Sequence, residues 1–143
     1  MSEYDYIIYT RGFYNEGTGE GKWIALITQE KKVIKTLVGK NEKSNEARIK
    51  LVAIANSLYK IESNSKVLLL CDSQYATNSI IRGWFKNWER KNWKTNQGTV
   101  VQNRDIWQYL IEIISKLDLD IRWYQDYEGT SLGNRMKIMV NKI

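Results

Sequence analysis

Apolar residues change their spacing near Ser44, and this change constrains the possible folds more than any other feature of the chain. Three segments before it are rich in aromatic and β-branched residues, which is typical of β-strands. They are Asp5–Thr10, Lys22–Thr28 and Lys32–Val38. From Ser44 to Ile61 the apolar residues instead recur at helical spacing, with Ser44 or Asn45 as the N-cap. We therefore predict an antiparallel meander of three strands that leads into a helix.

The rest of the chain is predicted to alternate between strands and helices. The predicted elements are a strand at Val67–Cys71, a helical stretch from Ser73 to about Glu89, a helix at Val101–Leu117, a strand at Asp120–Tyr124 and a helix from Leu132. The first of these is wholly apolar, which is typical of a strand buried on both faces. Gly83 is expected to interrupt the helical stretch, and Gly12, Gly17, Gly19 and Gly21 to form a loop or hairpin turn. This order predicts an α/β fold with a mixed five-stranded sheet flanked by helices, and a single domain over residues 1–143.

The composition excludes several kinds of chemistry. The 143 residues include no histidine and a single cysteine, Cys71, which we expect to be buried. Histidine-based acid–base catalysis, histidine metal ligands and Ser-His-Asp or Cys-His mechanisms are therefore excluded, and no internal disulfide can form. No apolar run approaches the roughly 20 residues that span a bilayer, and no signal-peptide pattern is present. We expect no membrane partner and a cytoplasmic or other intracellular location, while the net charge of +6 favours a polyanionic partner.

Four motifs occur in an order that resembles one known family. They are Tyr9-Thr10-Arg11-Gly12 followed by Lys22–Leu26, then Arg48–Ala53, then Cys71-Asp72-Ser73-Gln74-Tyr75, and then Trp84–Thr95 continuing into Asn103–Trp107. Together they resemble a type 1 ribonuclease H of the bacterial kind, with its basic protrusion. Trp123–Gly129 and Asn134–Lys137 stand where that family has a histidine-containing loop and the start of its last helix. The resemblance implies a ribonuclease H-like fold and a nucleic-acid partner.

The resemblance also implies where an active site should lie. The family uses four carboxylates to hold two magnesium ions for an in-line displacement at phosphorus. The corresponding positions here are Arg11, Lys50, Asp72 and Lys137. Only Asp72 offers oxygen ligands, because ammonium and guanidinium groups have no acceptor atom. We therefore predict a catalytically inactive domain, not an enzyme, with no metal cofactor and with side-chain cations in the space of the lost ions.

Three functions remain open for such a site. The cations could grip the nucleic-acid backbone without cutting it. They could instead be a salt-bridged remnant, with the domain acting as a scaffold or assembly subunit whose partner is a protein. A third hypothesis keeps ribonuclease H activity through a displaced metal site of Glu46 and Asp72 with Asp126 or Glu128. Charge reversal at three positions argues against the third, since each cation repels metal ions.

Residues 82–104, called the basic handle below, carry most of the net charge. Their basic residues are Arg82, Lys86, Arg90, Lys91, Lys94 and Arg104, against the single acid Glu89. Basic side chains interleaved with tryptophan suit phosphate contacts whose affinity falls with salt. We expect Trp84, Trp88 and Trp93 to pack the small core of the handle, and the cations to face phosphates.

Further polar positions complete the predicted interface. The resemblance implies that Ser44, Asn45 and Gln74 contact the backbone or minor groove of an RNA–DNA hybrid, double-stranded RNA or a single strand. Gly12 either permits close approach of its backbone to a ligand or serves only its turn. The predicted nucleic-acid-binding residues are Arg11, Gly12, Ser44, Asn45, Lys50, Gln74, Arg82, Lys86, Arg90, Lys91, Lys94 and Lys137.

Overall fold

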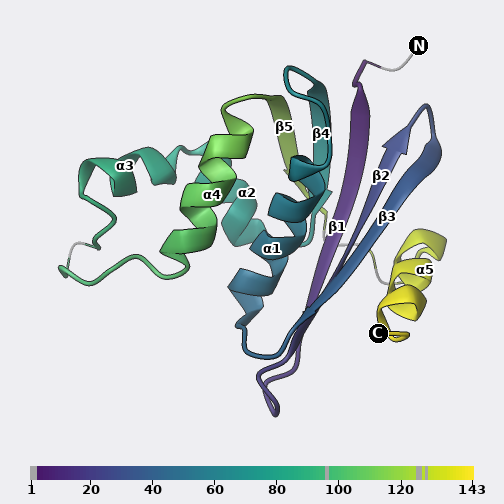
Figure 1. The fold of residues 1–143 in the computed structure, drawn as a ribbon, viewed down its shortest axis with the longest axis horizontal. Coiled ribbons are helices and arrows are strands. Elements are labelled where there is room, and N and C mark those ends of the chain that lie inside the picture. The colour runs from purple at the N-terminus through teal and green to yellow at the C-terminus, as the bar shows by residue number, and fades with distance from the viewer. Residues whose placement is uncertain (1–2, 96, 125–126, 128) are drawn as a thin grey trace.

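The fold is built on one twisted sheet whose strands run in both directions. The computed structural model describes residues 3–95, 97–124, 127 and 129–143. The elements are β1 (Tyr6–Tyr14), β2 (Gly21–Gln29), β3 (Lys32–Asn41), α1 (Glu46–Tyr59), β4 (Lys66–Cys71), α2 (Gln74–Ile81), α3 (Trp84–Arg90), α4 (Arg104–Ile114), β5 (Asp118–Trp123) and α5 (Ser131–Val140). In the described part of the chain the strands form a five-stranded sheet in the order β3-β2-β1-β4-β5 (Figure 1). The predicted α/β class and mixed sheet are confirmed.

The direction of the strands follows from the lengths of their connections. β1, β2 and β3 are joined by short turns and pair antiparallel, whereas β4 pairs parallel with β1 and β5 pairs parallel with β4. Parallel neighbours need a crossover connection, and here helices provide it. The carboxyl ends of β1, β4 and β5 therefore meet at the same edge of the sheet.

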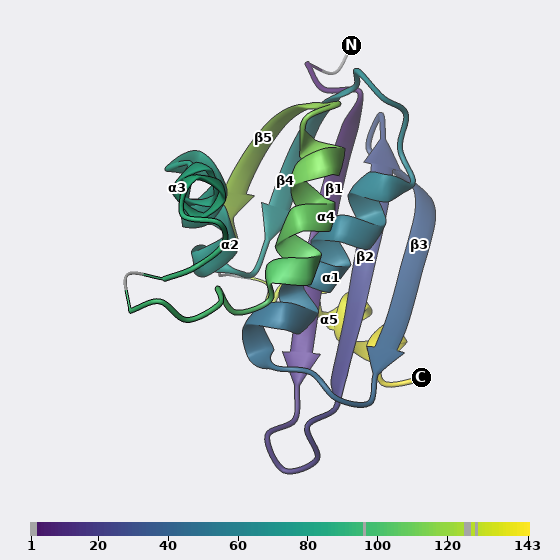
Figure 2. The ribbon, with the colours of Figure 1, turned by 60° about the vertical axis from the view of Figure 1, so that its left-hand side comes forward.

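Helices cover both faces of the sheet, with a different core on each side. α1 and α4 lie on one face, and α5 lies on the other (Figures 1 and 2). The larger core joins α1 and α4 to the sheet through residues such as Leu51, Leu69 and Leu110. The smaller core packs Met136 and Val140 of α5 against β2. Asn45 caps the start of α1, because its side chain accepts a hydrogen bond from the Arg48 backbone N–H at 2.8 Å, so Asn45 rather than Ser44 is the N-cap.

The basic handle projects from the side of the sheet that carries α1 and α4, as Figure 1 shows for α3. Gly83 has a φ of 66°, a left-handed conformation that glycine adopts without strain, and it separates α2 from α3. The Trp88 ring lies 5.4 Å from Trp107 and 6.0 Å from Trp93, centroid to centroid. Trp93 and Trp107 are buried, so Trp88 and Trp93 pack inward but belong to the main core rather than to a small core of the handle. Trp84, which we expected beside them, belongs to none of the core clusters of the described residues.

The predicted element ends need correction in three places. β1 continues through Arg11 and Gly12 to Tyr14, so the turn to β2 lies at residues 15–20. α4 begins at Arg104, because Asn103 has a left-handed φ of 62° that a helix cannot include, while the Val101 backbone N–H donates to the Trp93 carbonyl across the handle. β5 begins at Asp118 rather than Asp120. Among the described residues, no helix has the length and apolar character to cross a membrane.

Candidate functional site

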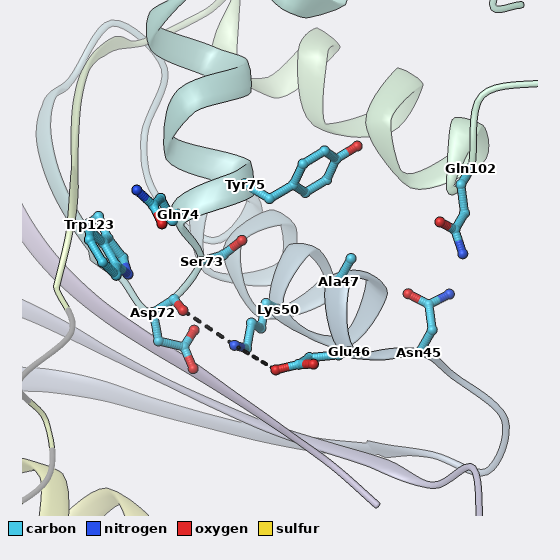
Figure 3. Close-up of a pocket in the computed structure, with 10 residues that line it drawn as sticks. All are labelled: Asn45, Glu46, Ala47, Lys50, Asp72, Ser73, Gln74, Tyr75, Gln102 and Trp123. Atoms are coloured by element: carbon cyan, nitrogen blue, oxygen red, sulfur yellow. Dashed lines mark hydrogen bonds and ion pairs between the residues drawn. The ribbon is translucent and has the colours of Figure 1, made fainter. Parts of the chain in front are cut away.

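A pocket of about 540 Å³ opens where β4 and β5 end (Figure 3). The lining comes from the start of α1, from the segment between β4 and α2, from the start of α2, from the end of β5 and from Gln102 just before α4. The lining residues are Asn45, Glu46, Ala47, Lys50, Asp72, Ser73, Gln74, Tyr75, Gln102 and Trp123. Ligands of open α/β sheets bind at the carboxyl ends of strands, so this pocket is the candidate site.

Asp72 is the first residue after β4 and is fixed by the neighbouring strand. Its Oδ2 accepts a hydrogen bond from the Gly12 backbone N–H at 3.1 Å. Its Oδ1 is buried and accepts no hydrogen bond from the described residues. Burial raises the pKa of the Asp72 carboxyl, and this effect exceeds the opposing effects of Lys50, the Gly12 N–H and Arg11. The negative charge of the Asp72 carboxylate is therefore only partly balanced by these three neighbours.

Lys50 reaches the same place from α1. Its ammonium donates to the Asp72 backbone carbonyl at 3.3 Å and lies 3.4 Å from Glu46 Oε1, one helical turn earlier. Figure 3 shows the ammonium between these two acceptors. The Lys50 side chain is 19% exposed, so it occupies the floor of the pocket rather than its rim.

Gly12 allows α1 to lie against β1. A Cβ atom at this position would stand 2.8 Å from Lys50 Cγ and 3.0 Å from the Lys50 backbone nitrogen. The missing side chain at Gly12 therefore serves an approach of helix to strand, while the approach of a ligand that we considered there stays a prediction. The same contact brings Lys50 and Asp72 together.

Arg11 points to the face of the sheet that carries α5, whereas Gly12 faces α1, because successive residues of a strand face opposite sides. Its residue is 8% exposed, and its guanidinium lies 4.6 Å from the centre of the Phe13 ring and 5.1 Å from that of Tyr127. It also donates to the Gly133 carbonyl in the first turn of α5 at 3.3 Å. Arg11 thus joins β1 to α5 behind the pocket.

Lys137 is exposed on α5, and no hydrogen bond or ion pair among the described residues connects it to Arg11, Lys50 or Asp72. The structure therefore brings together Lys50 and Asp72 but does not gather all four aligned positions into one cluster. The carboxylate of Glu46 also lies in the pocket. Among the described residues, the charged groups that line the pocket are one ammonium, of Lys50, and two carboxylates, of Glu46 and Asp72. The lining therefore does not contain the cationic cluster that we expected.

The other predicted contacts fall into two groups. Gln74 is exposed at the start of α2 and lines the pocket, as does Asn45, whose amide also donates to Asn103 Oδ1 at 3.2 Å. Ser44 donates to the Asn45 carbonyl and lies outside the pocket lining. The cations of the handle are all exposed: Arg82, Lys86, Arg90, Lys91, Lys94 and Arg104. Sequence reasoning missed Tyr75, Gln102 and Trp123, which only the fold brings to the pocket.

Comparison with known proteins identifies the family. The pattern of the RNase H family matches residues 3–137. The chain belongs to the RNase H family. It is 33% identical over 134 residues to the ribonuclease H of Hahella chejuensis, which covers 94% of this chain and 89% of that protein. It is 29% identical over 139 residues to the ribonuclease H of Nitratidesulfovibrio vulgaris strain DP4, with 97% and 88% covered.

A solved structure supports the fold. The foamy viral protease-reverse transcriptase in complex with RNA/DNA hybrid superposes with a TM-score of 0.80 at 13% identity. The match covers 98% of this chain and 20% of that one. At this identity the likeness concerns the RNase H fold alone.

The relatives' names contradict one expectation from the sequence. We expected a chain that is not an enzyme, yet its relatives are named ribonuclease H, and membership of this family indicates an enzyme. The expectation rested on the charge of four aligned positions, and those positions alone do not establish whether the chain is an enzyme. The structure brings the Glu46 carboxylate, one helical turn before Lys50, into the same pocket as Asp72.

The magnesium pair of the RNase H family does not fit the described residues of this pocket. No group of three or more acidic, histidine or cysteine residues that could hold a metal ion occurs among them. Glu46 and Asp72 are the carboxylates of the pocket lining, and the Lys50 ammonium already contacts Glu46 and the Asp72 carbonyl. Asp126 and Glu128, the other groups of the displaced-site hypothesis, lie outside the described residues.

Proposed function

We propose that this RNase H family protein binds nucleic acid along a surface that runs from the pocket to the basic handle. The observation that carries the proposal is the cluster of exposed cations on α3 and its flanks, at Arg82, Lys86, Arg90, Lys91 and Lys94. α2 leads from the pocket directly into the handle, and Gln102 at the end of the handle returns to the pocket. Phosphate contacts along this path would release counterions and give salt-dependent affinity.

An RNA–DNA hybrid is the first ligand to consider. The relatives carry the name of an enzyme that acts on RNA, and the foamy viral neighbour was solved with an RNA/DNA hybrid. We propose that the handle corresponds to the basic protrusion of type 1 bacterial enzymes, and that Asn45 contacts the sugar–phosphate backbone beside it. Double-stranded RNA and single strands share the same backbone charge and are the alternatives.

A salt-titrated binding panel tests this proposal. Hybrid, double-stranded RNA and single strands of equal length are compared with wild type and with a triple variant, Lys86→Gln, Arg90→Gln and Lys94→Gln. We expect the variant to bind more weakly and to show a shallower salt dependence, by a slope of roughly 0.7–0.9 for each lost phosphate contact. The matched control changes Lys31, Lys32 and Lys35 to Gln in the β2–β3 turn and β3, with the same loss of charge and no expected effect.

Two results would contradict the binding proposal. One is equal weakening by the handle and control variants, which would indicate net charge rather than a defined surface. The other is no binding of any nucleic acid at low salt, which would favour a protein partner.

Cleavage is measured on the same hybrid with magnesium or manganese. The Asp72→Asn variant shows whether any cleavage takes place at the pocket. Loss of activity in this variant would place the reaction there, whereas unchanged activity would place it elsewhere on the protein or in a contaminant. Wild type without cleavage would leave binding as the function of this surface.

A further inference from the structure

Trp123 has an exposed side chain at the end of β5. It ends β5 and pairs with Cys71 in the parallel register of β4 and β5. Trp23, Trp93 and Trp107 are at most 8% exposed, whereas Trp123 is 42% exposed. Trp123 belongs to none of the core clusters of the described residues, so its exposed face is available to contact a ligand.

The surroundings of Trp123 are polar and shaped as a pocket. Figure 3 shows the indole beside Gln74 at one end, with Asp72 and Lys50 next to them. The volume of about 540 Å³ lies within the roughly 300–1,000 Å³ of small-molecule sites. An aromatic wall with amide groups near its edge suits a planar heterocycle that carries donors and acceptors.

The charge of the pocket favours an uncharged ring over a phosphate. The Lys50 ammonium is engaged by Glu46 and by the Asp72 carbonyl, and the Asp72 carboxyl lies beside it. With two carboxylates and one ammonium, the described lining does not attract an anion. Phosphates are better placed on the exposed cations of the handle.

We propose that the pocket takes one unpaired base of a bound nucleic acid, stacked on the exposed face of Trp123 with its edge toward the Gln74 amide. The base must be unpaired, because the faces of bases within a duplex are already covered by their neighbours. This inference rests on the proposed nucleic-acid binding and adds a preference for single-stranded segments next to the duplex.

The test compares two hybrids that differ only in the bases of short RNA overhangs at both ends. One carries ordinary nucleotides and the other carries abasic residues, so their backbone charge is identical. Stacking on the indole stabilises the bound base, so wild type should bind the ordinary overhang roughly tenfold more tightly, which corresponds to about 1.4 kcal/mol. Trp123→Ala should abolish this difference, while Trp123→Phe should keep part of it.

A second readout is independent of affinity. Acrylamide quenching of tryptophan fluorescence should decrease when wild type binds the ordinary overhang and should not decrease with the abasic one. The Trp123→Phe variant lacks the exposed indole, so its quenching should be insensitive to the base. Thermal unfolding of both variants checks that the fold is kept.

The outcomes separate this inference from the function on which it rests. Equal, tight binding of both overhangs by wild type would overturn the stacking role and leave backbone binding intact. A base preference that survives Trp123→Ala would overturn it as well. Failure of wild type to bind even the blunt hybrid at low salt would overturn both proposals.

Discussion

Asp72 illustrates at the scale of one residue how a site can cost stability. Burial raises the pKa of its carboxyl, so the folded state favours the protonated form more than the unfolded state does. The ionised group therefore lowers stability at neutral pH. This penalty is absent below the unfolded pKa of about 3.9 and complete above the folded pKa.

Asp72→Asn should consequently raise the melting temperature at pH 7 by a few degrees. The asparagine can still accept the hydrogen bond from the Gly12 N–H. The advantage should shrink as the pH is lowered toward about 4, where wild-type Asp72 becomes protonated in both states. Asp118→Asn, at an exposed aspartate, is the control. A variant that melts below wild type at pH 7 would show that the electrostatic attraction of Lys50 and Arg11 outweighs burial.

Gly12 gives a second prediction at this scale. Alanine would place its Cβ 2.8 Å from Lys50 Cγ and 3.0 Å from the Lys50 nitrogen, so α1 and β1 must separate. Such overpacking costs about 1–3 kcal/mol. We expect chemical denaturation to show this loss for Gly12→Ala and almost none for Gly17→Ala, in the exposed hairpin turn. Equal stability of the two variants would mean that the helix and strand can part freely.

At the scale of elements, α1 and α4 are joined by an ion pair whose strength depends on pH. Arg48 of α1 donates to both oxygens of Asp105 of α4, at 2.8 and 2.6 Å, and lowers the pKa of Asp105 to about 2. Because the folded pKa is depressed, this contribution is present above the unfolded pKa of about 3.9 and is lost as the pH falls toward 2. The Asp105 side chain is 70% exposed, so solvent screening keeps the contribution below about 1 kcal/mol.

Asp105→Asn should therefore destabilise the protein slightly at pH 7, and the difference from wild type should vanish near pH 2. Urea denaturation at several pH values measures it. Glu112→Gln, an exposed change on the same helix, should leave the pH dependence unaltered. A difference that persists at pH 2 would point to helix packing instead of the ion pair.

Element types were predictable from the sequence because they depend on local spacing, whereas the site depended on contacts between distant elements. The end of β1 shows the difference. Gly12 looked like the start of a turn, yet Gly12 continues the strand because α1 packs on its bare backbone. Once β1 extends through residue 12, Arg11 and Gly12 must face opposite sides of the sheet, and Arg11 can no longer join Lys50. Gln102 had no local signal, and the motif that begins at Trp123 did not indicate that its indole lines the pocket.

At the scale of the whole molecule, the question is whether the handle folds together with the main core. It extends from the sheet, but Trp88 packs on Trp93 and on Trp107 of α4, and Trp107 also donates from its indole nitrogen to the Tyr75 hydroxyl at 3.2 Å. These contacts continue the main core into the handle. We propose on this basis that residues 1–143 form a single cooperative unit.

Unfolding should then show one transition for every probe. Far-UV circular dichroism reports the sheet and helices, while tryptophan fluorescence is weighted toward the handle and α4, where four of the six tryptophans lie. The two curves should coincide within error, as two-state unfolding requires. Trp88→Ala should lower the common midpoint, since truncating a large aromatic leaves an unfilled volume at a cost of about 3–5 kcal/mol when fully buried and less for this partly buried ring. A fluorescence transition that precedes the circular dichroism would show that the handle melts on its own. In that case the cations would be carried on a separately folding arm, and their contribution to binding would fall with temperature before the pocket is lost.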